Sequence, residues 1–390
     1  FKNLGELNYQ SRFEQLKSIT STKKRNVEYY FDIIRNQILS FSEDTMIIEA
    51  IKEFKNAFYN VGSDTTPEQF DAIRERVLGY YQNEFMAMLN DHVSMDLSID
   101  NYLPTESRTV IFQDLYIANN PHPTGSKSLL DSANDGSAYS GVHAKYHPIL
   151  RNYLEKFGYY DIFLIDASTG DMLYSVFKEV DFATNLANGE YRNTNFGRIV
   201  QSAIQSSDRK FVQLIDFAAY DPSYHAPASF IATTIYDGDE KIGIIVFQMP
   251  IQKINQILTG NNSWRDDGLG DTGETFIVGN DYKLRSVTRE IIEDLEGHVA
   301  MMKKKNYSAS IVQQVRKMRT NILMEEIRMD AVKNGLLGNS GTSLEKNDNG
   351  KEVLTAYAPL NIADVKWMIL SSMHEAEASS KIKNLRHENI

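Results

Sequence analysis

Apolar residues recur at helical spacing through the first sixty positions of the chain. Neither proline nor glycine occurs in residues 13–59, and the apolar residues that share a helix face are Ile34, Ile38, Phe41, Ile47, Ile51, Phe54 and Phe58. This pattern predicts one helix over residues 13–59, ended by the turn-forming segment 60–64. A helix of about 45 residues is roughly 65 Å long at a rise of 1.5 Å per residue. Because that length exceeds the core of a compact domain, a stalk helix in a dimer is favoured over a helical bundle domain.

A further helix is predicted to begin at Thr66. Thr66 suits the cap position, Pro67 suits the first helical position, and Gln69 completes a capping box. Apolar residues continue at helical spacing from there to position 85. Residues 1 to about 105 are therefore predicted to be helical, with almost no strand signal.

From about residue 109 the pattern changes to short apolar runs separated by turns. The runs 159–166 and 172–177 flank a turn that contains Gly170, and the runs 230–236 and 241–249 flank the turn 237–239. These features predict two β-hairpins. A helical stretch at 195–205 lies between them. Adjacent hairpins favour an antiparallel sheet and an α+β module.

The same order of elements is predicted a second time. Strands are expected at 274–278, 282–286, 341–345, 352–360 and 365–373, and helices at 289–305 and 311–336. Two similar α+β modules in tandem after a long helix are thus the predicted organisation. The chain begins without Met in helix-like sequence and ends in the helix-prone segment 375–386, so we expect it to be a fragment of a longer protein.

Composition narrows the possible functions. The chain has 390 residues, 41 basic and 52 acidic side chains, a formal net charge of −11 and 42% hydrophobic residues. These values are typical of a folded protein with two or three domains. The acidic balance argues against nucleic-acid binding, which requires a basic surface. There is no cysteine, which removes disulfides, thiol nucleophiles and zinc–thiolate sites. No apolar stretch approaches the roughly 18 residues of a membrane span.

Sequence motifs typical of enzymes are either absent or occur beside the wrong predicted secondary structure. Gly268, Gly270 and Gly273 spell a dinucleotide fingerprint, but they precede a predicted strand instead of following one, so we interpret them as turn glycines. His143 and His147 lie one helical turn apart with no third ligand evident, which favours packing over metal binding. We therefore expect no cofactor and no metal.

Nucleophilic and paired-carboxylate chemistry are equally unsupported. The sequence contains no Gly-x-Ser-x-Gly elbow. Asp161 and Asp166 flank one predicted strand, where their spacing places them on opposite faces. A hydrolase would need a base beside a nucleophile or a metal, so catalysis by this chain is not expected.

Several segments resemble the double-Cache (tandem PDC, PAS-like) ectodomains of bacterial transmembrane receptors. Residues 268–275, reading Gly-Leu-Gly-Asp-Thr-Gly-Glu-Thr, resemble the stretch that opens the second module of that family. Further resemblances to strands of the two modules are carried by Arg285-Ser286 and by the segments 353–360, 367–370, 160–166 and 227–232. The resemblance implies a helical stalk over 1–105, a membrane-distal sensor module over 106–258, a membrane-proximal module over 259–374 and an exit helix over 375–390.

The segment 216–230 is the best candidate for ligand contact. It concentrates aromatic residues, an acid and two prolines directly before a predicted strand, which are the walls, polar groups and stiff loop that a small-ligand site needs. It also matches the place where PAS-like ectodomains hold their ligand. Lys178 would pair with a ligand carboxylate, and Asp181 or Asp216 with an ammonium group. The predicted ligand-binding residues are Tyr174, Lys178, Asp181, Asp216, Phe217, Tyr220, Tyr224, Ser229 and Phe230.

Two interpretations of the segment 216–230 remain open. It either contacts a ligand or is only the packed lid of the first core. The Arg-x-Trp-Tyr sequence of the amino-acid-binding version of the family does not occur in this half of the chain, since the two tryptophans are Trp264 and Trp367. That departure argues against an ordinary amino acid as the ligand. A small carboxylate, an amine or a similar molecule is expected instead.

The resemblance implies the extracytoplasmic, periplasmic sensor region of a receptor in the bacterial cytoplasmic membrane. The apolar face of helix 13–59 is the expected seam of a homodimer, and the output domain would be a histidine kinase, a chemotaxis module or a cyclase. The second module is expected to be mainly structural and to transmit the signal. Two alternatives remain, which are a structural or partner-binding surface module without a small ligand and, with less support, a hydrolase.

Overall fold

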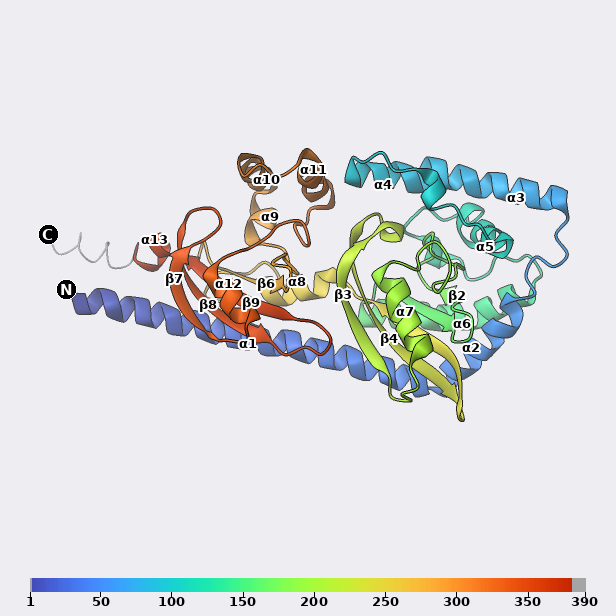
Figure 1. Cartoon of the computed structure of the whole chain (residues 1–390), viewed down its shortest axis with the longest axis horizontal. Helices are drawn as coiled ribbons and strands as arrows, with labels where there is room; N and C mark the ends of the chain where they lie inside the picture. Colours follow the sequence, from blue (N-terminus) through green and yellow to red (C-terminus); the bar gives the residue numbers. More distant parts are fainter. Residues whose placement is uncertain (1, 381–390) are drawn as a thin grey trace. The chain divides into compact units, whose positions relative to one another are not determined.

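The computed structural model describes residues 2–380, which divide into two compact units. One unit combines residues 1–33 with 251–390, and the other comprises residues 34–250. We call them the terminal unit and the central unit. Each contains an antiparallel sheet covered by helices, as Figure 1 shows. The predicted α+β fold, with a long N-terminal helix followed by two sheet modules, is therefore confirmed. Of the expected exit helix, only α13 (Glu375–Ala378) lies within the described residues, and 381–390 lie outside them.

The predicted single helix over residues 13–59 is wrong in one respect, because it is broken at Asp44. The chain forms α1 (Lys2–Glu43) and α2 (Thr45–Phe58). Asp44 takes an extended conformation, and its carboxylate accepts a hydrogen bond from the backbone N–H of Met46 at 2.7 Å. A short acidic side chain competes with the helix backbone and favours a cap over an interior position. A capping residue without an accompanying Gly or Pro therefore ends α1.

The apolar face of α1 is buried within the chain, which corrects the expected dimer seam. In the terminal unit Leu16 is 2% exposed and packs with Trp264 and Leu354. In the central unit Ile34 and Ile38 are buried as well. Since this face is already covered by the chain's own residues, it is not free to contact a second copy.

The capping box at the start of the next helix is confirmed. In α3 (Pro67–Tyr80) the Thr66 hydroxyl accepts from the N–H of Gln69 at 3.2 Å, and the Gln69 side chain accepts from the N–H of Thr66 at 2.9 Å. The helix continues through a π turn into α4 (Met86–Val93). Residues 34–93, which the sequence assigned to a stalk, contribute buried side chains such as Phe54 and Phe85 to the central unit.

The sheet of the central unit has five antiparallel strands in the order β2-β1-β5-β4-β3. The strands are β1 (Asp161–Asp166), β2 (Met172–Ser175), β3 (Val212–Tyr220), β4 (Ala226–Asp237) and β5 (Glu240–Gln248). Both predicted hairpins are present. The strand β3 was not predicted, because residues 216–220 were taken as part of a loop. In the structure only a short turn around Asp221–Ser223 separates β3 from β4.

Helices cover both faces of this sheet, so that all six residues of β1 are buried. On one face Phe163 of β1 packs on Phe196 of α7 (Asn195–Gln205), with ring centroids 4.5 Å apart. On the other face Tyr174, which pairs with Leu164, stacks on Phe54 of α2 at 4.9 Å. Alternate strand residues point to opposite faces, which explains why the strand reads as a nearly continuous apolar run. The remaining helices of this unit are α5 (Ser107–Gln113) and α6 (Ala138–Phe157).

Gly197 fixes the start of α7 against the preceding loop. A Cβ atom at Gly197 would clash with the backbone oxygens of Tyr191 and Arg192. We predict that Gly197→Ala lowers the free energy of unfolding by about 2–3 kcal/mol, because backbone cannot move as cheaply as a side-chain end. Gly141→Ala in α6 is the matched control, since nothing lies within 4 Å of its Cβ position. That change should be neutral or stabilising by up to about 1 kcal/mol. Urea unfolding measures both, and equal effects would contradict the clash.

The sheet of the terminal unit has four antiparallel strands in the order β6-β9-β8-β7. The strands are β6 (Glu274–Gly279), β7 (Gly341–Lys346), β8 (Glu352–Leu360) and β9 (Trp367–His374). The predicted strand 282–286 is wrong, since only isolated bridges form at Leu284 and Lys283. The N–H of Ile277 bonds to the Ser286 hydroxyl at 2.9 Å, so a side chain replaces the backbone partner that a ladder would supply.

The predicted helices 289–305 and 311–336 are each divided into two shorter helices. Besides α1 and α13, the described helices of the terminal unit are α8 (Ile251–Thr259), α9 (Arg289–Glu293), α10 (Leu295–Lys304), α11 (Ala309–Met318) and α12 (Asp330–Leu336). The predicted helix 311–336 ends at Met318, where Arg319 adopts a left-handed conformation with φ 52°. The glycines at 268–273 form a packed turn before β6, with Arg289 donating to the carbonyl oxygens of Gly270 and Gly273 at 3.0 and 2.8 Å. This agrees with their interpretation as turn glycines.

Candidate ligand-binding site

Three fully buried acids gather at one end of the central unit's sheet. Asp161 begins β1, while Glu179 and Asp181 lie in the loop that follows β2, and the three are 0%, 4% and 0% exposed. We call them the acidic cluster. Buried acids are rare unless they are paired, so the partners of each carboxylate decide what the cluster does.

Asp161 shapes the chain around the cluster. One carboxylate oxygen, Oδ1, accepts hydrogen bonds from the backbone N–H groups of Val176 and Phe177, both at 3.0 Å. These donors belong to the residues just after β2, so Asp161 satisfies the backbone where the β1–β2 hairpin stops pairing. The loop after β2 then turns away from the sheet. It contains two non-glycine residues with left-handed backbone, Lys178 and Ala183, a strain that tends to accompany functional sites.

The other two acids are held by hydroxyl groups. Tyr220, the last residue of β3, donates to Asp181 Oδ2 at 2.6 Å. Glu179 accepts from Tyr160 at 2.8 Å and from Ser223 at 2.8 Å. Charge-assisted bonds of this kind are short and fix the carboxylates in place. Within residues 2–380 the side-chain donors to these two acids are hydroxyl groups, and neither acid forms a salt bridge with a basic side chain.

Several buried acceptor atoms near the acidic cluster have no hydrogen-bond partner within residues 2–380. They are Asp161 Oδ2, Asp181 Oδ1 and Gln248 Oε1, accompanied by the hydroxyls of Tyr191 and Ser175. Gln248 lies directly opposite Asp161 on β5, and Tyr191 and Tyr220 have ring centroids 6.3 Å apart. An unpaired buried polar group costs about 1–3 kcal/mol. When the two carboxyl groups are ionised, their free oxygens and the amide oxygen of Gln248 can only accept, so a donor is the partner that they lack in that form.

Lys178 lies in an aromatic cage beside the acidic cluster. Its ammonium nitrogen stands 4.5 Å from the ring centroid of Tyr174 and 5.0 Å from that of Phe182. The same group donates to the backbone carbonyl of Ser175. A buried ammonium over aromatic faces gains cation–π attraction, and its side chain is only 2% exposed.

Burial shifts the protonation of all these groups towards the neutral form. Burial and the neighbouring Asp181 raise the pKa of Asp161 to about 8. Burial also raises the pKa of Asp181 to about 6, and it raises that of Glu179 well above its usual value. Burial lowers the pKa of Lys178 to about 7, although Asp161 opposes that shift. A cation that enters the cluster would favour the charged carboxylates and displace their protons.

The structure brings some of the nine predicted residues together. Tyr174 belongs to the aromatic cage around Lys178, while Asp181 bonds to Tyr220, whose ring lies 5.3 Å from that of Phe230. The other four have different local roles. Asp216 and Phe217 occupy a bulge in β3, Ser229 donates to the carbonyl of Ile215 at 2.6 Å, and Tyr224 packs on Phe85 at 5.9 Å.

Sequence reasoning placed Glu179 opposite the segment 216–230, together with Tyr174, Lys178 and Asp181, but it missed Asp161, Gln248 and Tyr191 as members of a site. Asp161 and Gln248 stand at the ends of two long apolar runs, and they are paired across β1 and β5. The signal that the sequence offered for these two positions was a charged or amide residue at the end of an apolar run. Their convergence with the loop 178–181 depends on which strands are neighbours, and the sequence does not state that.

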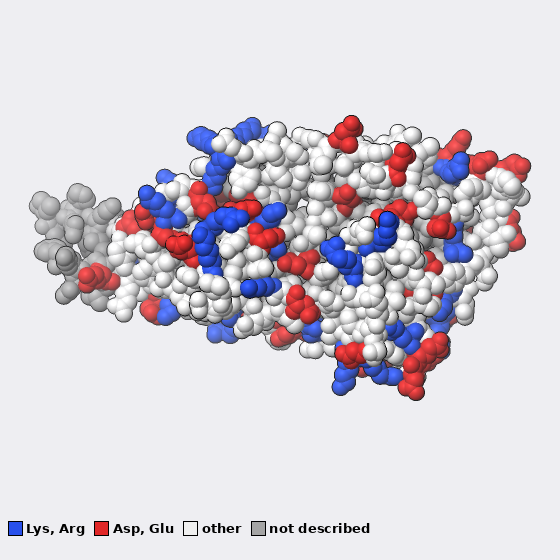
Figure 2. Space-filling view, in the orientation of Figure 1, with Lys and Arg blue, Asp and Glu red and all other residues white. Residues whose placement is uncertain are grey.

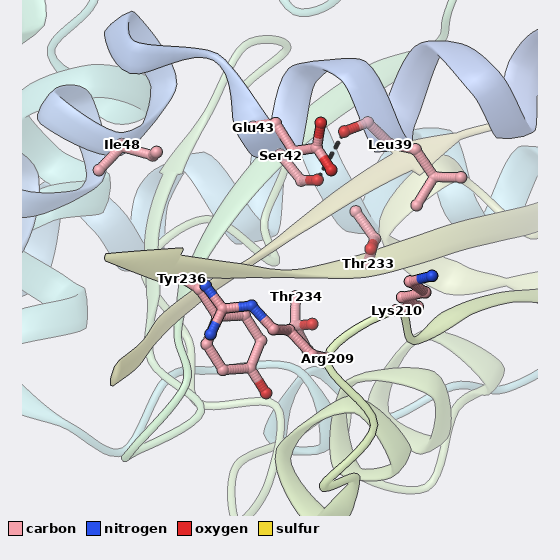
Figure 3. A pocket seen from close by; sticks show the side chains of 9 residues that line it. All are labelled: Leu39, Ser42, Glu43, Ile48, Arg209, Lys210, Thr233, Thr234 and Tyr236. Atoms are coloured by element: carbon pink, nitrogen blue, oxygen red, sulfur yellow. Dashed lines mark hydrogen bonds between the residues drawn. The ribbon is translucent and has the colours of Figure 1, made fainter. Parts of the chain in front are cut away.

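A pocket lies elsewhere in the central unit, as Figure 3 shows. Its volume is about 510 Å³, and none of the nine predicted residues lines it. The C-terminal end of α1 forms one side, where the Ser42 hydroxyl donates to the carbonyl of Leu39 at 2.7 Å. Arg209 and Lys210 come from the loop before β3. The guanidinium carbon of Arg209 lies over the ring of Tyr236, 4.7 Å from its centroid.

The two histidines of α6 belong to the packed interior. Their rings stack with centroids 4.3 Å apart, and His147 Nδ1 lies 2.6 Å from the Tyr174 hydroxyl. Burial and the nearby Lys178 lower the pKa of His147 to about 2. Within residues 2–380 no group of three or more His, Asp or Glu side chains is arranged to hold a metal ion. In the same part of the chain no helix is both long and apolar enough to cross a membrane.

The terminal unit contains a polar cluster that the sequence did not suggest. His298 Nδ1 lies 2.9 Å from Glu290 Oε2, and its Nε2 contacts Glu325. These residues and Glu274 line a cavity of about 80 Å³. Burial lowers the pKa of His298, but the hydrogen bonds to Glu325 and Glu290 outweigh it and the net direction is upward. Burial raises the pKa of Glu274 to about 7.

Three solved structures illustrate what this chain is similar to. The extracellular domain of vpHK1S-Z8, described as a histidine kinase, is 10% identical with a TM-score of 0.45, and the match covers 98% of this chain and 96% of that one. The ligand-binding domain of the Pseudomonas aeruginosa PAO1 chemoreceptor PctB, in complex with L-Arg, is 13% identical with a TM-score of 0.36, covering 82% and 91%. The ligand-binding domain of the Pseudomonas fluorescens chemoreceptor CtaA, in complex with L-serine, is 14% identical with a TM-score of 0.34, covering 78% and 93%.

Two of the three are described as ligand-binding domains of chemoreceptors, and the third as the extracellular domain of a histidine kinase. No family model and no curated protein matches this chain. At these identities and TM-scores the function of this chain has to be argued from its own residues.

Proposed function

We propose that this chain is the extracytoplasmic sensor region of a bacterial transmembrane receptor, and that the central unit binds a small molecule with a positively charged group. The observation that carries the proposal is the pair of orphaned carboxylate oxygens, Asp161 Oδ2 and Asp181 Oδ1, in a cluster whose acids are almost completely buried. An ammonium group has three N–H donors and no acceptor. It therefore suits a set of unpaired acceptors better than a carboxylate does.

The fold supports a sensing role for such a site. The acidic cluster lies at the start of β1 and in the strained loop after β2, and Tyr220 at the end of β3 donates a hydrogen bond to it. A cation bound there would favour the loop arrangement that places both carboxylates against it. A coupling of about 1–3 kcal/mol between ligand and loop arrangement is sufficient for a switch. The receptor would receive this change through the terminal unit and the long helix α1, and we assign no catalysis to this chain.

A thermal-shift panel tests the proposal. The panel contains small amines, amino acids, carboxylates, purines and sugars. A ligand at 100 times its dissociation constant adds about 2.7 kcal/mol to the free energy of unfolding, which is roughly 5–10 °C for units of this size. We expect amines to give the largest shifts. Shifts confined to carboxylates would contradict the charge of the ligand, and no shift across the panel would favour a structural or partner-binding module.

A further inference from the structure

A histidine of the terminal unit is held between two carboxylates. His298, on α10, is 5% exposed. Its Nδ1 atom lies 2.9 Å from Glu290 Oε2 of α9, and its Nε2 atom contacts Glu325 Oε1 on the segment between α11 and α12. A neutral imidazole has one N–H and can donate to only one of two acceptors, whereas the imidazolium ion donates to both. The geometry therefore fits the doubly protonated ring while both acids are ionised.

Further acids surround this ring from other parts of the unit. Glu274 of β6 and Asp348 of the turn between β7 and β8 line the same cavity of about 80 Å³ as His298 and its two partners. The basic residues of the adjoining elements are engaged with other groups, which are the carbonyl oxygens of Gly270 and Gly273 for Arg289, Glu296 for Arg316, and Glu326 for Arg328. Lys305 acts on Asp348, where it lowers the pKa against the effect of burial. The imidazolium of His298 is thus the cation that directly contacts the acids of the cavity.

Burial distinguishes this cluster from the charges at the surface. Figure 2 shows Lys and Arg side chains beside Asp and Glu side chains over the face of the terminal unit in view, where water and salt screen them. Glu325 is 5% exposed, like His298. Charges interact more strongly away from water, so the gain or loss of one proton alters the balance of the whole cluster. Burial disfavours the imidazolium, but the hydrogen bonds to Glu325 and Glu290 outweigh it and raise the pKa of His298.

The contact with Glu325 anchors a strained segment. Residues 319–329 join α11 to α12, and the N–H of Leu323 bonds to the carbonyl of Leu284 at 3.0 Å. Leu323 has a φ of 66°, a left-handed conformation that is an outlier for a bulky residue. Strain of this kind persists only where the surroundings hold it. The bond between His298 and Glu325 is one of the contacts that hold this segment.

We propose that His298 is a proton-operated latch that ties α10 to the segment 319–329 of the terminal unit. While the ring carries both protons, it donates to Glu290 and Glu325 and holds the segment in place. When one proton leaves, one ring nitrogen turns a lone pair towards a carboxylate, and the acids of the cavity repel one another. The cavity leaves room for water to solvate these acids as the segment moves away.

The direction of the pH effect follows from the raised pKa of His298. A histidine with a raised folded-state pKa contributes stability that is present at low pH and lost as the pH rises through that value. Glu274, whose pKa burial raises to about 7, ionises over the same rise and adds to the repulsion. Segment 319–329 is therefore closed at mildly acidic pH and loosens as the pH rises. This inference is independent of any ligand in the central unit.

Hydrogen exchange of the whole chain at pH 6 and pH 8 tests the latch. The amides of Leu323 and Ile327, which bond to the carbonyls of Leu284 and Tyr282, report on the segment. Their protection factors, corrected for the pH dependence of chemical exchange, should fall by up to about tenfold per pH unit above the pKa of His298, since opening releases one proton. The amides of β9, a strand paired on both sides, are the internal reference. Equal falls in β9 would indicate a general loss of stability and contradict the latch.

Nitrogen NMR of the His298 ring measures its protonation directly in the wild-type chain. We expect both ring nitrogens to carry a hydrogen at pH 6, and the pKa to lie above the ordinary value of 6.5. A ring with a single protonated nitrogen at pH 6 would overturn the proposal, whatever the variants show.

Two histidine variants separate the latch from other titrations. His298→Gln cannot gain or lose the proton, so the protection of segment 319–329 should no longer fall with pH. His374→Gln is the matched control, because it removes a half-buried histidine of the same unit whose pKa burial lowers, and it should keep the wild-type fall. A fall that persists in His298→Gln would sink the latch. Should that variant not fold, Glu290→Gln at the more exposed partner must lower the pKa of His298 by NMR, and an unchanged pKa would count against the proposal.

Discussion

Replacing Asp181 with Asn is expected to weaken the binding of a small amine by roughly two to four orders of magnitude. Removing one partner of a buried charge pair costs about 3–5 kcal/mol, because the remaining charge is left without compensation. Asp181 is completely buried, and its Oδ1 atom is unpaired. The isosteric Asn keeps an oxygen that can accept from Tyr220, so the hydrogen bond at 2.6 Å has a replacement. Isothermal titration of the best amine from the panel measures the loss.

The control for this variant is Asp64→Asn. Asp64 is exposed in the same unit, and its substitution changes the net charge by the same amount. It should leave the dissociation constant unchanged. Because burial raises the pKa of Asp181 to about 6, binding of a cation near that pH releases protons, and the wild-type affinity should rise with pH. If Asp181→Asn bound the amine as tightly as the wild type does, the acidic cluster would not be the site.

The second large effect concerns the pH dependence of stability. Burial raises the pKa values of Asp161, Glu274 and Asp181 to about 8, 7 and 6. An acid with a raised folded-state pKa contributes stability that is fully present below the unfolded value and is lost as pH rises through the folded value. Each such group changes the free energy of unfolding by roughly 1.4 kcal/mol per pH unit between its two values. Stability should therefore fall between about pH 4 and pH 7.

Other groups set the limits of this window. The lowered pKa of Lys178, about 7, acts in the opposite direction above pH 7, because the unfolded chain then binds the extra proton. Asp166 and Asp221 have lowered pKa values, so acidification below about pH 4 destabilises the fold through them. The free energy of unfolding is therefore expected to fall between about pH 4 and pH 7. His298, whose pKa is raised, adds to it in the same direction.

Asp161→Asn is expected to flatten this profile. The Asn side chain still offers an oxygen to the N–H groups of Val176 and Phe177, so the loop after β2 keeps its anchor. It cannot ionise, so the loss of stability on raising the pH becomes smaller by about 1.4 kcal/mol per pH unit. Urea unfolding at pH 5 and pH 7 measures the difference, with Asp64→Asn as the control. Parallel profiles for wild type and Asp161→Asn would show that this carboxyl is ionised in the folded chain.

Predictions that depend only on residues close together in the sequence were correct. The capping box at Thr66 and Gln69 uses residues three positions apart, and it forms as predicted. Both hairpins of the central unit were predicted because apolar runs and turn residues adjoin each other in the chain. The break at Asp44 was missed because it depends on one side chain outcompeting the helix, without a Gly or Pro to mark it.

Strand β3 and the segment 282–286 were misjudged for a different reason. Strand β3 is an edge strand with mixed burial and a bulge, so its pattern lacks clean alternation. The segment 282–286 has strand-like residues, but the Ser286 hydroxyl takes the N–H of Ile277 that a ladder would use. Both outcomes depend on neighbours that are distant in the sequence or on hydrogen bonds to a side chain.

The sequence by itself determined the class of fold, the tandem order of two α+β modules and the acidic, cysteine-free character of the chain, because periodicity and composition are properties of short segments. Only the tertiary structure decided that the apolar face of α1 is covered and that Asp161 and Asp181 share one buried cluster. Asp161 starts one strand and Asp181 follows another, 20 positions later. Their meeting depends on sheet order and on the removal of water around both carboxylates, which no local pattern encodes.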